Sequence, residues 1–248
     1  AVSDAGSVGH ANYGAFKESI LTGSETDVFC FIHLCPTGQA VSPEVRWDNV
    51  DVDRTLNLIE RERDVIRGVK IRANGPAVIE PTLALLKTAK NLSAEAKIPL
   101  MVHIGLNSEE AVSDEAISAF NRQVVRLMGP GDILTHVYSA RRGRLVLEDR
   151  ELMRELKEAA GRGVVMDAAP AKSHFSFEHA RRAIDEGLVP TTISTDITKT
   201  NYRGPALFSL PVVMSKFLAL GMTLDDVVEK TTAAPARVLG EEGNRGSL

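Results

Sequence analysis

Short runs of apolar residues alternate along this chain with longer stretches of helical periodicity. The short runs predict six strands, most of them rich in Val, Ile or Leu: 28–34, 68–72, 100–104, 132–136, 164–168 and 191–195. Their apolar character is continuous rather than alternating, which is typical of parallel strands covered on both faces. The pattern therefore favours an α/β protein with a parallel sheet.

The segments between these runs predict helices. In 81–97, Leu85, Ala89, Leu92 and Ala96 fall on one stripe at helical spacing. Further helices are expected over 149–160, over 175–186, from Thr223 onward with Asp226 as its capping partner, and between Pro235 and Gly240.

Alternating strands and helices predict a parallel sheet with right-handed crossover connections. Two closures fit this order, an open doubly wound sheet and a (β/α)8 TIM-type barrel. No GxGxxG or GxxxxGK[ST] motif follows an early strand, so the nucleotide-binding forms of the open sheet lose support.

Composition and charge narrow the class of protein. Of the 248 residues, 44% are hydrophobic and 25% are charged, which is typical of a globular chain and excludes a disordered or collagenous one. The net charge of −4 disfavours nucleic acid and anionic membranes as partners. No apolar run reaches the roughly 18 residues of a membrane span. Cys30 and Cys35 are expected to be reduced core residues, and the default location is cytoplasmic.

Ionisable residues lie at or near the carboxyl ends of four predicted strands. They are Lys70 in VKIRA, His103 in LMVHIG, His136 in ILTHVY and Asp196 in TTISTD. In a barrel all carboxyl ends meet at one mouth, so we expect these four side chains to converge there. Singly, each histidine also fits a hydrogen-bonded core position and Asp196 a helix cap. A lysine inside an apolar strand must be paired, neutralised or modified.

This set of residue types supports metal-assisted hydrolysis. Two imidazoles and one carboxylate suit zinc or a similar ion. An unprotonated lysine amine can capture CO2 as a carbamate, an anion that can bridge two metals about 3.5–4 Å apart. We therefore expect two divalent metal ions, zinc being the first choice, and a CO2-derived carbamate on Lys70.

Several phrases resemble the amidohydrolase superfamily, in particular its dihydroorotase-like branch of amidohydrolases and deacetylases. They are VKIRANG, LMVHIG, ILTHVYSA, FSFEHARRAIDEGLVPTTISTDIT and LPVVMSKFLALGMTLDDVVEKTTAAPARVLG. The resemblance covers nearly the whole chain and implies a (β/α)8 barrel. It also implies metal ligands in the order HxH, carboxylated Lys, His, His and Asp. Lys70, His103, His136 and Asp196 match the last four in type and order.

The chain departs from that pattern because it contains no HxH. The resemblance places the missing motif on a strand 1 before AVSDA, which itself is expected to end strand 2. Residues 1–240 are then predicted to be the barrel domain without strand 1. Residues 241–248 are predicted to begin a C-terminal segment of a small β-domain absent from this chain. The alternative is a degenerate barrel that lacks the first metal site.

The resemblance implies a role for Asp196, and positions along the chain suggest roles for other residues. Asp196 would ligate a metal, take a proton from the attacking water and pass it to the leaving group. Arg72 shares a face with Lys70 and could bind a substrate carboxylate bidentately, or could form a surface ion pair. Tyr138 could donate a hydrogen bond to an oxyanion, or could be a loop aromatic. His174 and His179 are interpreted as structural.

These inferences lead to one predicted activity and two rivals. The predicted protein is a zinc-dependent hydrolase that removes an acyl group, through an amide or ester bond, from a small carboxylate-bearing substrate. The first rival is a cyclic amidohydrolase similar to dihydroorotases and hydantoinases. The second is a non-catalytic scaffold of the same fold. The expected partner is a small-molecule substrate, and assembly into a homo-oligomer is left open.

Overall fold

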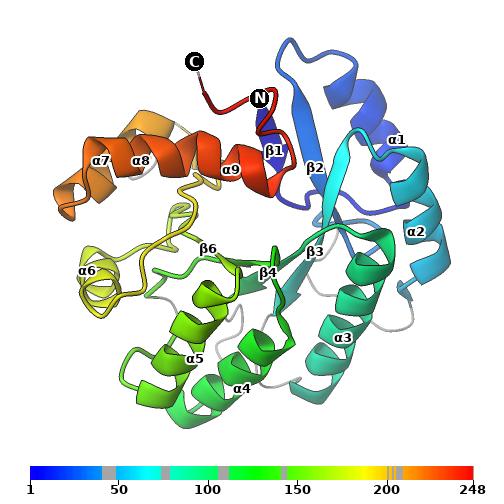
Figure 1. Ribbon diagram of the computed structural model, residues 1–248. Helices are drawn as coiled ribbons and strands as arrows, with labels where there is room; N and C mark the ends of the chain where they lie inside the picture. Colours follow the sequence, from blue (N-terminus) through cyan, green and yellow to red (C-terminus); the bar gives the residue numbers. More distant parts are fainter. Residues whose placement is uncertain are drawn as a thin grey trace. The chain divides into compact units, whose positions relative to one another are not determined.

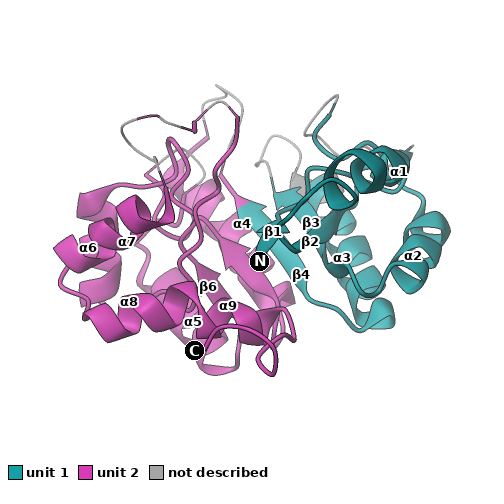
Figure 2. Cartoon of the chain, turned by 90° about the horizontal axis from the view of Figure 1, so that it is seen from above, with its two compact units in different colours: residues 1–74, 78–103 teal, residues 75–77, 104–248 magenta. Residues whose placement is uncertain are grey.

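The computed structural model describes residues 1–40, 49–73, 79–105, 112–140, 144–199, 201–202, 204 and 209–247. The chain divides into two compact units, coloured separately in Figure 2. The first consists of Ala1–Asn74 and Val78–His103, and the second of Gly75–Ala77 and Ile104–Leu248. Within the described residues, no helix has the length and apolar character needed to cross a membrane.

The first unit is a sheet with helices attached to it (Figure 1). Its strands follow the chain order β1 (Val2–Asp4), β2 (Val28–His33), β3 (Ile66–Ala73) and β4 (Leu100–Ile104), the last of which ends at the unit boundary. The pairs β1–β2 and β2–β3 are parallel. The helices are α1 (Tyr13–Phe16), the π-helical η1 (Lys17–Leu21), α2 (Val52–Arg61) and α3 (Ile79–Ala96).

The register between β2 and β3 determines what lies on one face of this sheet. Phe31 is opposite Gly68, and His33 is opposite Lys70. A Cβ on Gly68 would lie 2.1 Å from the Phe31 ring, so the missing side chain makes room for that ring. Alternate residues of a strand share a face, so His33 and Lys70 follow Phe31 and Gly68 toward the carboxyl ends.

The second unit contains two regular parallel strands and the remaining helices. The strands are β5 (Ile133–Thr135) and β6 (Val165–Asp167), and Thr135 is opposite Asp167. The helices are α4 (Asp114–Leu127), α5 (Arg150–Gly161), α6 (Phe177–Asp185), α7 (Leu210–Ala219), α8 (Leu224–Thr231) and α9 (Ala233–Val238).

Helix starts follow the capping chemistry of the sequence. The predicted cap of α8 is confirmed, because the Thr223 side chain accepts a hydrogen bond from the Asp226 backbone N–H at 3.1 Å. Asp149 caps α5 in the same way through Glu151 and Leu152. Gly187 follows α6 with φ of +91°, a conformation that glycine adopts without a steric penalty.

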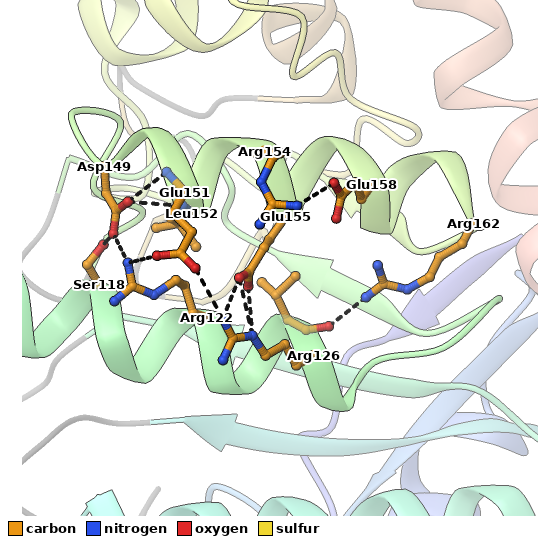
Figure 3. A network of polar contacts seen from close by, with 11 residues as sticks. Ser118, Arg122, Arg126, Asp149, Glu151, Leu152, Arg154, Glu155, Glu158 and Arg162 are labelled. Carbon is orange, nitrogen blue, oxygen red and sulfur yellow. Dashed lines mark hydrogen bonds and ion pairs between the residues drawn. The ribbon is translucent and has the colours of Figure 1, made fainter.

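Helices α4 and α5 are joined by a network of ion pairs (Figure 3). Arg122 and Arg126 of α4 both reach Glu151, and the Arg126 guanidinium also lies 2.6 Å from the buried Glu155 carboxylate. Arg122 further pairs with the capping Asp149. Each of these carboxylates is paired with a guanidinium group of the same network. The network therefore connects the two helices and is not a candidate site.

Five of the six predicted strands form with boundaries within two residues of those expected, and β1 confirms a strand end in AVSDA. Segment 191–195 is different, because its only bridge joins Thr192 to Asp167. The backbone N–H of Ile193 donates to the carbonyl of Lys230 in α8 instead of continuing a strand ladder. Six strands are present in the described part of the chain, so a closed eight-stranded barrel is not confirmed.

Candidate functional site

The four predicted metal ligands lie within strands, directly after a strand, or directly after a segment that was predicted as a strand. Lys70 belongs to β3 and is 4% exposed, and His103 belongs to β4. His136 directly follows β5, and Asp196 directly follows segment 191–195. The three basic residues are buried and Asp196 is partly exposed.

Lys70 lies against a glycine that leaves space for its side chain. Gly6 follows β1 with φ of +95°, and a Cβ at Gly6 would lie 2.4 Å from Cγ of Lys70. The same Cβ would lie 3.5 Å from Cδ2 of His33. The aliphatic part of Lys70 and the edge of the His33 imidazole therefore both border Gly6, which carries no side chain.

His33 is an uncharged buried imidazole. Its Nδ1 accepts a hydrogen bond from the Cys35 backbone N–H at 3.0 Å, so in the neutral ring the proton is on Nε2. Burial, followed by the positive charges of Lys70 and Arg72, lowers the pKa of His33 from 6.5 to about 3. His33 Nε2 has no hydrogen-bond partner among the described residues. His33 was not among the predicted site residues, because nothing in FIHLC indicates the register of this strand with Lys70.

Arg72 is held beside His103 by a glutamine. Its Nη1 donates to Oε1 of Gln39 at 3.0 Å, and its Nη2 lies 3.4 Å from Nε2 of His103. Gln39 in turn donates from Nε2 to the carbonyl of Gly6 at 3.2 Å. Because a guanidinium can only donate, Nε2 of His103 is the accepting, proton-free nitrogen of its ring.

His136 presents a similar ring nitrogen in the second unit. Its Nδ1 lies 2.9 Å from the carbonyl oxygen of Ala169. A carbonyl only accepts, so Nδ1 carries the proton and Nε2 is the nitrogen with the lone pair, which is the tautomer that can bind a metal. A backbone carbonyl behind Nδ1 is a common way to orient a metal-ligating histidine.

His174 lies directly on this imidazole. The rings of His136 and His174 are stacked, with centroids 4.1 Å apart and planes inclined by 24°. His174 Nδ1 is also 3.4 Å from Oγ of Ser139. From the sequence, His174 was expected to be structural because it lies near the start of a predicted helix. The structure places it next to a predicted ligand.

Backbone strain is concentrated at the strand ends of this unit. Four residues other than glycine have positive φ there: His136 at 72°, Ala169 at 36°, Ala171 at 46° and Asp196 at 52°. Such conformations cost about 1–3 kcal/mol each and cluster at functional sites. The strain thus falls on two predicted ligands and on the residue that orients His136.

A buried carboxylate, that of Asp167, links the strand ends near His136 and Asp196 by hydrogen bonds. Asp167 accepts hydrogen bonds from Oγ1 of Thr135 at 2.7 Å, Oγ1 of Thr192 at 2.8 Å and Oγ of Ser194 at 3.0 Å. The backbone carbonyl of Asp167 accepts from the N–H of His136 at 3.0 Å. Asp167 therefore connects β5, β6 and segment 191–195. It was not among the predicted site residues.

Two further predicted residues have defined surroundings. Tyr138 is 0% exposed, and its hydroxyl donates to the carbonyl of Leu188 at 2.9 Å. That bond occupies the proton that an oxyanion would need. The backbone carbonyl of Asp196 accepts from Nδ2 of Asn201 at 2.9 Å, which anchors the loop after segment 191–195.

Two curated proteins are similar to this chain over nearly its whole length. One is a deacetylase of Agrobacterium fabrum, 33% identical over 240 residues, and the other a deacetylase of Brucella anthropi, 32% identical over 240 residues. The alignments cover 95% of this chain but only 56% and 57% of these relatives, so the chain spans little more than half of their length. No known family model matches the sequence.

Solved structures give the same result. A dihydroorotase is 30% identical with a TM-score of 0.82, covering 96% of this chain and 62% of that one. An adenine deaminase is 26% identical with a TM-score of 0.85, covering 99% and 64%. These neighbours are members of the amidohydrolase superfamily. The predicted resemblance is confirmed, and the chain belongs to this superfamily: homologues named deacetylases match 95% of it, and its strands and helices superpose on those of the dihydroorotase and the adenine deaminase.

Proposed function

We propose that the protein to which this chain belongs is a metal-dependent hydrolase that removes an acyl group from a small carboxylate-bearing substrate. The observation that carries the proposal is the orientation of His136, whose Nδ1 is bonded to the carbonyl of Ala169 and whose Nε2 is proton-free. The deacetylase relatives favour acyl removal. We expect a small molecule, rather than nucleic acid or a membrane, as the partner, and a cytoplasmic location.

The residues present fit a divalent cation. Lys70, His103, His136 and Asp196 are the proposed ligands, with Lys70 carboxylated. The side-chain chemistry fits at His136, whose Nε2 is proton-free. Nε2 of His103 accepts from Arg72 and would exchange that bond for a metal. Two ions of the zinc class would supply an activated water and a polarised scissile carbonyl.

The chain's own side chains would manage the proton and the substrate. Asp196 is proposed as the base that takes a proton from the attacking water and then returns it to the leaving group. Arg72 is proposed to bind the substrate carboxylate, because Gln39 holds its guanidinium beside His103. Tyr138 is left out of this proposal because its hydroxyl proton is bonded to Leu188.

Opening of a cyclic amide is the second candidate function. The dihydroorotase similarity favours it, since that structure is 30% identical to this chain. The same residues would serve, because the attacking water and the scissile amide carbonyl are unchanged when the amide lies in a ring. N-acyl amino acids and cyclic imides offered side by side separate the two reactions by their products.

The test uses the full-length protein and its Asp196→Asn variant. Elemental analysis should find about two zinc-class ions per chain in both proteins, and turnover of N-acyl acids should fall about 10²–10⁴-fold in the variant. A matched variant, Arg72→Lys, should raise KM for carboxylate substrates with little change for their amides. Full turnover in Asp196→Asn would contradict the proposed role of Asp196. A full-length protein that binds no metal and turns over no substrate would contradict the proposal and favour a scaffold.

A further inference from the structure

The imidazole of His33 carries a buried proton for which the described residues offer no acceptor. His33 is the last residue of β2 and is 0% exposed. The Cys35 backbone N–H donates to its Nδ1 and thereby fixes the proton on Nε2. That Nε2 has no partner among the described residues. A buried donor left unbonded costs about 1–3 kcal/mol, so its presence calls for an acceptor.

The place where an acceptor would arise is defined by Lys70. His33 and Lys70 are opposite each other in the register of two adjacent parallel strands, so both project from the same face. Gly6 borders the stem of Lys70 and Cδ2 of His33, and Cδ2 is the ring atom bonded to Nε2. An ammonium on Lys70 could not accept from His33, since it has only donors.

We propose that His33 is a positioning residue for Lys70, and that its Nε2–H donates a hydrogen bond to an oxygen that Lys70 gains on carboxylation. This inference rests on the proposed function, which requires the lysine carbamate. It adds a residue from a neighbouring strand that selects the anionic form of Lys70.

The carboxylation step is balanced without any oxidant or cofactor. The unprotonated Nζ of Lys70 forms an N–C bond with dissolved CO2, and one C–O π pair moves onto an oxygen. The nitrogen then loses one proton to water. The product carries one negative charge in place of a neutral amine. The neutral Nε2–H of His33 can stabilise that charge by donating a hydrogen bond to it.

Two substitutions separate the two nitrogens of His33. His33→Asn keeps an acceptor near the Nδ1 position for Cys35 and removes the Nε2–H donor. His33→Gln keeps an amide N–H near the Nε2 position and removes the Nδ1 acceptor. The full-length proteins are titrated with 13C-labelled bicarbonate, and the carbamate carbon is measured by 13C NMR. Lys70→Met identifies the signal, which it should lack.

Wild type and His33→Gln are expected to carboxylate at similar bicarbonate concentrations. His33→Asn should need about tenfold more, the effect of one hydrogen bond to a charged group. Equal bicarbonate dependence of His33→Asn and wild type would overturn the inference. So would a wild type without any carbamate signal, or a signal that persists in Lys70→Met.

A second measurement needs no variant of His33 and so survives a folding failure. In wild-type protein with 15N-labelled histidine, the Nε2–H resonance of His33 should shift and exchange more slowly when bicarbonate is added. The same resonance should not respond in Lys70→Met, and a response there would also overturn the inference. A protein that shows His33-dependent carboxylation but hydrolyses no acyl or cyclic substrate would contradict only the proposed function.

Discussion

His136 donates its Nδ1 proton to the carbonyl oxygen of Ala169 across 2.9 Å, although both residues have positive φ. The strained backbone thus holds the imidazole with its Nε2 proton-free. The backbone of the second unit sets this ring orientation through the hydrogen bond to Ala169. This orientation is the strongest structural support for a metal ligand in that unit.

The first prediction concerns metal content. His136→Ala should lower the bound metal by about one ion per chain, because a ligand nitrogen is lost. Elemental analysis after dialysis measures the change. His179→Ala is the matched control, since His179 lies in α6 away from the strand ends and should leave metal content intact. Unchanged metal in His136→Ala would contradict the assignment of that ligand.

The second prediction concerns Asp167. Asp167→Ala should reduce the free energy of unfolding by about 3 kcal/mol, because the three hydroxyls of Thr135, Thr192 and Ser194 lose a charged acceptor. Ser194→Ala removes one of those bonds and should cost only about 1 kcal/mol. Urea unfolding of both variants measures the difference. Similar small losses in both would show that Asp167 does not hold these segments together.

The third prediction concerns the space beside Lys70. Gly6→Ala should destabilise the protein by about 2 kcal/mol, since φ is +95° and the new Cβ would meet Cγ of Lys70 at 2.4 Å. Gly14→Ala is the control, because a Cβ on Gly14 meets nothing within 4 Å and its helical position favours alanine. Thermal unfolding compares the two. Equal melting temperatures for both variants would show that Lys70 has room to move.

The fourth prediction concerns acid stability. His33 has an ordinary pKa of 6.5 when unfolded and about 3 when folded, so only the unfolded chain takes up its proton between these values. The contribution of the neutral His33 ring to the free energy of unfolding is fully present above pH 6.5. It falls by up to about 1.4 kcal/mol per pH unit on acidification until about pH 3. His33→Gln should show a shallower fall in urea unfolding with chelator present. Identical slopes would mean that His33 is protonated in the folded state.

The strand positions and the chemistry at their ends follow from the sequence. Continuous apolar runs such as Val28–His33 and Leu100–Ile104 identify buried parallel strands, because burial on both faces demands that composition locally. Segment 191–195 is rich in threonine rather than continuously apolar, and it forms one bridge. The backbone N–H of its Ile193 donates to the carbonyl of Lys230 in α8, a helix distant in the sequence. A local sequence pattern cannot predict this bond, because Ile193 and Lys230 are far apart in the sequence.

The surroundings of each candidate residue required the tertiary structure. Tyr138 is two residues beyond His136 in the sequence, yet its hydroxyl is bonded to Leu188. His174 is far from His136 in the sequence, yet the two rings stack. Both contacts join segments separated by more than thirty residues.

The sequence by itself therefore determined the fold class, the order of the strands and the identity of Lys70, His103, His136 and Asp196 as the residues to test. Residue type and hydrophobic period are local properties, and these decided all three. Only the tertiary structure decided which ring nitrogen of His33 and His136 carries the proton. A tautomer is fixed by the partner on the other side of the ring, and that partner is supplied by folding.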